Sequence, residues 1–195
     1  MSAHENLEHV EHAEHASHGG NKKIALLISV LALFLAFSET LGKSAQTHAI
    51  ALNVEINDLW AFFQAKTIRR TVVQTAAEQA KLGTPADDAA KAALQKQIDD
   101  WQKTAARYRK EPETHEGSEE LAERAKHAEH EREEATEKYH HYELASAAFQ
   151  ISIVLASATI ITGMVWLAWV GGLLTLTGIV ITALGIFNPH ILPLH

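Results

Sequence analysis

Glutamate and histidine occur together in several parts of this chain, which contains 13 histidines and no cysteine. Both side chains are ligands for zinc, copper and nickel. Glu137 and His140 form a Glu-x-x-His pair of the kind that di-metal helical bundles use. A second set shares one flank of the same predicted helix: Glu123, His127, His130 and Glu134. A di-metal site needs a second Glu-x-x-His, which the sequence lacks. For the second set a solvated charged helix face is the preferred interpretation, because the segment contains so many charges.

Residues 1–21 form a polar tail rich in histidine and glutamate. Its metal candidates recur every three residues: His9, His12, His15 and His18. A step of three distributes these side chains around a helix rather than gathering them on one side. The tail therefore predicts either a metal-binding segment or a solvated segment whose charge changes near the histidine pKa.

Composition excludes several classes of function. The net charge of −7 leaves no basic excess, so no nucleic-acid partner is expected. The lack of cysteine excludes disulfides and thiolate sites. The sequence also has no glycine loop that could cradle phosphate and no nucleophile elbow, so we expect no enzyme and no cofactor.

The last 52 residues contain no Asp, Glu, Lys or Arg. At about 1.5 Å per residue a single helix of this length would be roughly 78 Å long, whereas the hydrocarbon core of a bilayer is about 30 Å thick. The segment must therefore fold back, and residues 144–187 predict a transmembrane hairpin followed by a tail, 188–195. We place its turn at residues 169–172, because the pair Gly171-Gly172 can adopt conformations that other residues avoid.

A first span is predicted over residues 22–43. Glu39 and Lys43 are four residues apart near its end, so the two are expected to pair on one helix face at the membrane edge. A functional intramembrane carboxylate at Glu39 is the alternative. Gln150, near the start of the second span, could line a polar path, but its depth favours a hydrogen bond to a neighbouring helix or to interfacial water.

Small residues follow one face of the last predicted span at steps of three and four: Gly171, Thr175, Gly178, Thr182 and Gly185. Small residues at this spacing let membrane helices approach closely. The pattern predicts a packing face, either within the hairpin or between the subunits of a homo-oligomer.

Residues 44–143 are polar and charged with helical periodicity, and they predict an extramembrane helical stalk. Gly83-Thr84-Pro85 is expected to separate two of its helices, with Thr84 as the N-cap. The last stalk helix has coiled-coil-like spacing and leads into the second span without a breaker. The chain is therefore predicted to be all-α, with three transmembrane helices and a stalk.

The stretch from Asn57 to Ile68 reads NDLWAFFQAKTI. It resembles the motif of a bacterial inner-membrane family known as domain of unknown function 4337, in which the motif follows a first span. Phe63 stands where that family usually has tyrosine. The resemblance implies the same architecture and a bacterial inner-membrane location, and no reaction.

The motif residues have two possible roles. Those singled out are Asp58, Trp60, Phe63, Gln64 and Lys66. They could form a partner or ligand surface at the base of the stalk. Alternatively they could be an aromatic packing cluster, with Asp58 or Gln64 bonded across to another helix; aromatics at helical spacing favour this second role.

Three functions remain open from the sequence. The first is an oligomeric membrane scaffold or adaptor that presents the stalk to a protein partner. The second is a small channel or transporter component, and the third a metal-sensing or metal-buffering membrane protein. The pair Lys22-Lys23 predicts a cytoplasmic N-terminus and a periplasmic stalk.

Overall fold

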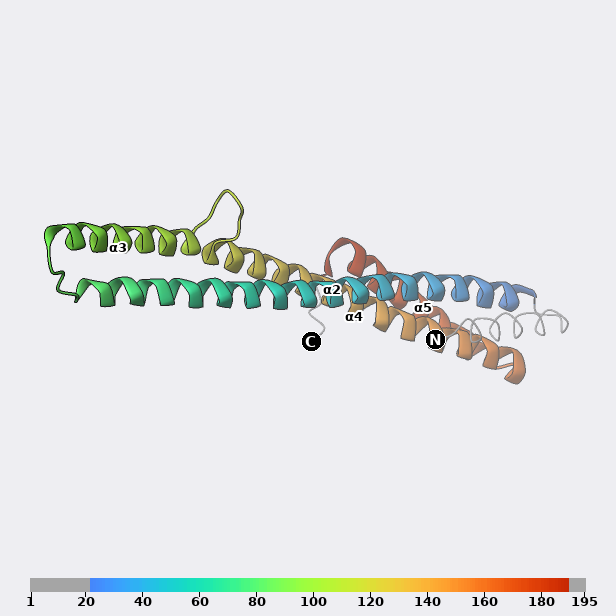
Figure 1. The fold of residues 1–195 in the computed structure, drawn as a ribbon. Helices are drawn as coiled ribbons and strands as arrows, with labels where there is room; N and C mark the ends of the chain where they lie inside the picture. Colours follow the sequence, from blue (N-terminus) through green and yellow to red (C-terminus); the bar gives the residue numbers. More distant parts are fainter. Residues whose placement is uncertain (1–21, 190–195) are drawn as a thin grey trace. The chain divides into compact units, whose positions relative to one another are not determined.

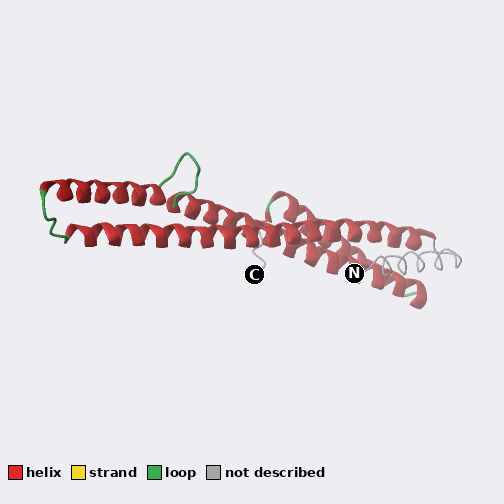
Figure 2. Ribbon diagram, in the orientation of Figure 1, coloured by secondary structure: helices red, strands yellow, loops and turns green. Residues whose placement is uncertain are grey.

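Four helices and their connections make up the computed structural model, which describes residues 22–189. The helices are α2 (Lys22–Lys81), α3 (Asp88–Arg109), α4 (Ser118–Thr162) and α5 (Val165–Phe187), and this part of the chain contains no strand (Figures 1 and 2). Stretches of α2, α4 and α5 are long and apolar enough to cross a membrane. The predicted all-α fold with three candidate spans is thus confirmed.

The chain divides into two compact units. We call the first the membrane unit; its described residues are 22–49 and 133–189. We call the second, Ile50–Arg132, the stalk unit. The two long helices α2 and α4 each contribute residues to both units.

The core of the membrane unit joins α2 to α4. Its buried side chains are Ile28, Leu31, Leu35, Ala145, Phe149, Ile153 and Ala156. The outer faces are equally apolar: Leu33 of α2 is 70% exposed and Leu173 of α5 is 67% exposed. Large apolar side chains on the outside are expected where the surrounding solvent is lipid. The apolar stretches of the membrane unit therefore have both an apolar core and apolar outer faces.

The small-residue face of α5 packs against α4 within the chain. A Cβ placed on Gly171 would lie 3.4 Å from the Ser152 carbonyl oxygen, and one on Gly178 would lie 2.9 Å from the Phe149 ring. A Cβ placed on Gly185 would also lie 3.0 Å from side-chain atoms of α4. Thr182 is buried on the same face, and Thr175 is half-buried. Of the two roles predicted for this face, packing within the hairpin is the one observed.

The predicted position of the hairpin turn was wrong. Helix α4 ends at Thr162, Gly163 adopts a positive φ of 71°, and α5 begins at Val165. The Gly163 N–H closes the last helical turn on the Thr159 carbonyl at 2.9 Å. A left-handed residue ends a helix, and glycine takes that conformation without steric cost. Gly171 and Gly172 lie inside α5 instead.

The stalk unit is built from α2 after residue 49, the whole of α3 and the start of α4. One cluster joins α2 to α4: Leu52, Ile56, Leu59, Leu121, Ala125 and Ala128. Helix α3 is capped by Asp87, whose carboxylate accepts a hydrogen bond from the Ala90 N–H at 2.7 Å. The predicted cap, Thr84, was thus three residues too early, because a carboxylate accepts the free N–H groups of a first helical turn at least as well as a hydroxyl does.

Candidate functional site

The motif from Asn57 to Ile68 lies on α2 in the stalk unit, where the helix has two distinct faces. Leu59 and Lys66 are buried, and Phe62 and Phe63 are partly buried against the core cluster. A second face points outward along the same helix. We define this outer face of α2 by nine exposed residues: Ile50, Val54, Asn57, Ala61, Gln64, Ile68, Val72, Thr75 and Gln79.

Lys66 links α2 to the segment that follows α3. Its side chain is only 8% exposed, and its Nζ donates to Glu111 Oε2 at 3.0 Å and lies 3.9 Å from Glu116 Oε2. The same ammonium lies 5.4 Å from the centre of the Phe62 ring and 5.6 Å from that of Tyr108. Hydrogen bonding and the charge of Lys66 hold the pKa of Glu111 below its usual 4.5. We call these five residues the Lys66 cluster.

Trp60 provides the second link in the stalk unit. Its indole N–H donates to Glu129 Oε1 of α4 at 2.9 Å, and its ring packs edge-on against Phe63 at 5.3 Å between centroids. Asp58 and Gln64 are both exposed, and Asp58 borders a cavity of about 460 Å³. The residues that bond across to other segments are therefore Trp60 and Lys66 rather than the expected Asp58 or Gln64.

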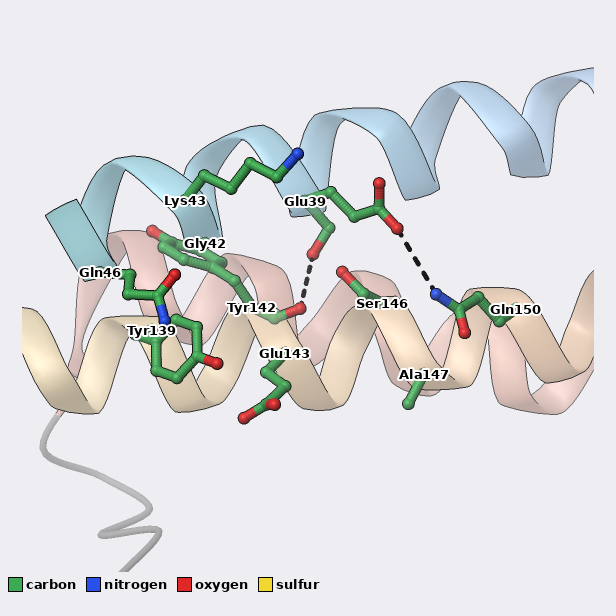
Figure 3. A pocket seen from close by; sticks show the side chains of 11 residues that line it. Glu39, Gly42, Lys43, Gln46, Tyr139, Tyr142, Glu143, Ser146, Ala147 and Gln150 are labelled. Atoms are coloured by element: carbon green, nitrogen blue, oxygen red, sulfur yellow. Dashed lines mark hydrogen bonds between the residues drawn. The ribbon is translucent and has the colours of Figure 1, made fainter. Parts of the chain in front are cut away.

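A polar cavity of about 420 Å³ lies between α2 and α4, near the end of the predicted first span (Figure 3). We call it the membrane-edge pocket. Its polar lining residues are Ser38, Glu39, Lys43, Gln46, Tyr139, Tyr142, Glu143, Ser146 and Gln150. Every one of these residues belongs to the membrane unit.

Two hydrogen bonds cross the membrane-edge pocket from helix to helix. The buried Ser38 hydroxyl donates to the Tyr142 carbonyl at 3.0 Å, and the Gln150 amide donates to Glu39 Oε1 at 3.4 Å. The expectation that Gln150 bonds a neighbouring helix is confirmed. The expected pairing of Glu39 with Lys43 is wrong: within residues 22–189 no ion pair joins them, because the Glu39 carboxylate turns toward α4 instead (Figure 3).

Ser146 lies in the wall of this pocket without a hydrogen-bond partner for its Oγ. The residue is only 7% exposed. Figure 3 shows its hydroxyl pointing from α4 toward α2, between the two interhelical hydrogen bonds. A buried hydroxyl without a partner costs about 1–3 kcal/mol. The Ser146 hydroxyl is therefore free to form a hydrogen bond inside the pocket.

The metal candidates do not converge in the part of the chain that the structure covers. Among residues 22–189 no group of three or more His, Asp or Glu side chains is placed to hold a metal ion. His127 is largely exposed and lies 3.7 Å from Glu131, one helical turn further along. His130 is also exposed. The candidates His9, His12, His15 and His18 lie outside the described residues.

Sequence reasoning missed the pocket as a unit, although it singled out Glu39, Lys43 and Gln150. Ser38 and Ser146 were not recognised as pocket residues. The signal was weak, since two serines near the ends of apolar segments are common in membrane helices. What identifies them is the alignment of α2 against α4, which the structure supplies.

Three apolar helices with apolar outer faces fit the class of multi-pass helical membrane proteins. Within that class, the chain belongs to the family described as domain of unknown function DUF4337, which it matches over residues 20–188. The resemblance seen in the twelve-residue motif is therefore confirmed over most of the chain. No curated protein and no solved structure matches it.

Proposed function

We propose that the protein is a non-enzymatic membrane scaffold that self-associates along the outer face of α2 and presents the stalk unit to a protein partner. The observation that supports this proposal is the composition of that face. All nine of its residues are exposed, and none is charged. Its large side chains are more than half exposed, with Ile50 at 57%, Val54 at 58%, Ile68 at 63% and Val72 at 61%.

The spacing of this face favours another helix as its partner. The residues follow steps of three and four, the spacing at which one helix presents a continuous stripe to another. From Ile50 to Gln79 the stripe is about 43 Å long at 1.5 Å per residue. An exposed stripe of this length on a helix otherwise rich in charge is typical of an interaction surface.

A second copy of the chain can supply the helix that this face requires as a partner. Copies inserted in one membrane share one topology, so their α2 helices leave the membrane on the same side and meet in parallel. Each residue of the outer face then lies near its own counterpart. Identical charges would repel there, and the face contains none. Asn57 and Gln64 can pair with their counterparts, because an amide both donates and accepts hydrogen bonds.

Neighbouring cysteines test this interface in a chain that has no cysteine of its own. Val54→Cys on the outer face should give a disulfide-linked dimer as the major product in oxidised membranes. Glu55→Cys is the matched control, because Glu55 is also exposed but lies about 100° further around the helix. Denaturing electrophoresis measures the dimer. Equal cross-linking at both positions, or a purely monomeric mass for the wild-type protein in mild detergent, would contradict self-association along this face.

We also propose a bacterial inner-membrane location with a cytoplasmic N-terminus and a periplasmic stalk. The pair Lys22-Lys23 supports it, since short cytoplasmic segments are enriched in lysine and arginine. Three spans then put the C-terminus on the same side as the stalk. Alkaline phosphatase fused to His195 should accordingly be active, since this enzyme requires the periplasm. A fluorescent C-terminal fusion that functions only in the cytoplasm would reverse the orientation.

The channel alternative receives less support. Gln150, its candidate polar residue, donates to Glu39 inside the membrane unit. The metal-buffering alternative depends on histidines of the N-terminal tail, outside the described residues. Neither alternative accounts for the uncharged outer face of α2, which the scaffold proposal uses.

A further inference from the structure

We propose that the membrane-edge pocket binds a primary ammonium group, carried either by an ethanolamine phospholipid or by a small soluble amine. This inference is independent of self-association, because every lining residue lies in the membrane unit of one chain. It rests on a vacant hydroxyl, an incompletely compensated carboxylate and the size and position of the cavity.

The vacant hydroxyl belongs to Ser146. Its Oγ is buried and points into the pocket without a partner. A primary ammonium carries three N–H donors, so it can donate to Ser146 and to neighbouring acceptors at the same time. Such a ligand removes the cost of leaving the hydroxyl unpaired.

The incompletely compensated carboxylate belongs to Glu39. It lies near the end of an apolar span, where a carboxylate requires a counter-charge. Its neighbour Gln150 supplies a neutral amide at 3.4 Å, which is a long hydrogen bond. The pocket contains two glutamates, Glu39 and Glu143, and one lysine, Lys43, so its lining has a net charge of −1. The lining therefore favours a cation.

The size of the pocket favours an organic cation over a bare ion. Its volume of about 420 Å³ falls within the range of small-molecule sites, about 300–1,000 Å³. Tyr139 adds an aromatic ring to the lining, and aromatic rings attract cations. For a phospholipid, Lys43 in the same lining would be available to the phosphate group.

The position of the pocket brings both sources of amine within reach. It opens between α2 and α4 at the end of the predicted first span, residues 22–43, where lipid headgroups are expected. Choline headgroups carry the same charge but no N–H, so they cannot donate to Ser146 or Glu39. The pocket should therefore distinguish ethanolamine from choline.

The test measures the thermal unfolding midpoint of the full-length protein in nanodiscs under three conditions. These are phosphatidylcholine alone, phosphatidylcholine with phosphatidylethanolamine, and phosphatidylcholine with free ethanolamine added to the buffer. Phosphatidylethanolamine should raise the midpoint above that in phosphatidylcholine alone. A rise with lipid but not with free ethanolamine identifies the lipid as the source, whereas a rise with free ethanolamine in pure phosphatidylcholine identifies the soluble amine. Identical midpoints under all three conditions would overturn the proposal.

Variants localise the effect to the pocket. Glu39→Gln should weaken, by about tenfold or more, the binding of whichever amine raises the midpoint, since a hydrogen bond to a charged group contributes about 1.5–3 kcal/mol. Glu123→Gln, the same substitution on an exposed part of α4, should bind as the wild type does. Ser146→Ala should weaken binding without lowering the midpoint in pure phosphatidylcholine, because it removes a hydroxyl that is unpaired there. Unchanged amine binding in both Glu39→Gln and Ser146→Ala would place the amine elsewhere.

Discussion

Replacing Gly178 with leucine is expected to destabilise the membrane unit by about 3 kcal/mol or more, the upper range for overpacking a core. A Cβ at this position would already lie 2.9 Å from Phe149 Cε1 and 3.0 Å from Cζ. The ring has little room to withdraw, because Phe149 is 1% exposed and stacks on Phe34 of α2 at 5.9 Å between centroids. The substitution therefore forces α5 away from α4 and disturbs the contact between α4 and α2.

Gly172 provides a matched control on the same helix. Nothing lies within 4 Å of a Cβ built there, so Gly172→Leu should keep the wild-type unfolding midpoint. Thermal unfolding in detergent, followed by circular dichroism, compares the two variants. If Gly178→Leu unfolds like the wild type, or if Gly172→Leu is equally damaging, close packing of α5 on α4 does not stabilise the unit.

The number of spans could be predicted because lipid imposes a composition that sequence displays directly. A segment without charges longer than one crossing must fold back. The position of the turn could not be predicted in the same way. Gly163 ends a helix, whereas Gly171 and Gly178 allow close approach to α4, and glycine looks identical in both roles. Only the contact with α4 distinguishes them.

The motif illustrates a second limit. Its aromatic residues predicted packing, and Trp60 and Phe63 do pack in the stalk unit. Their partners could not be predicted, because Lys66 meets Glu111 across 45 residues and Trp60 meets Glu129 across 69. Those pairings depend on where α3 ends and where α4 begins. Neither boundary is encoded in the motif itself.

The membrane-edge pocket depends even more than the motif contacts do on how α2 and α4 align along their length. Glu39 and Lys43 looked like an ion pair four residues apart, which is the most local interpretation available. The structure aligns Glu39 with Gln150, across 111 residues. Local spacing sets which side chains can meet on one helix, and a facing helix decides which of those meetings occurs.

Lys66→Met is expected to destabilise the stalk unit, which lowers the hydrogen-exchange protection of α3, and to make that protection less sensitive to acid. The variant keeps most of the apolar side chain and removes the ammonium that contacts Glu111 and Glu116. Lys66 lowers the pKa of Glu111 in the folded protein from the usual 4.5. A carboxyl whose folded pKa is lowered stabilises the fold above its unfolded pKa. That contribution is lost as the pH falls from 4.5 through the lowered value.

Hydrogen exchange over residues 88–109 measures this effect in the full-length protein at neutral pH and at about pH 3.5, below the usual carboxyl pKa. Protection of α3 in the wild type should drop on acidification, whereas Lys66→Met should start lower and drop less. A residual acid effect is expected in both proteins, because Arg109 separately lowers the pKa of Glu119. Lys103→Met, at an exposed position of α3, should behave as the wild type. If Lys66→Met and Lys103→Met respond alike to acid, the ammonium of Lys66 does not stabilise the stalk unit, and the motif acts through its aromatic packing alone.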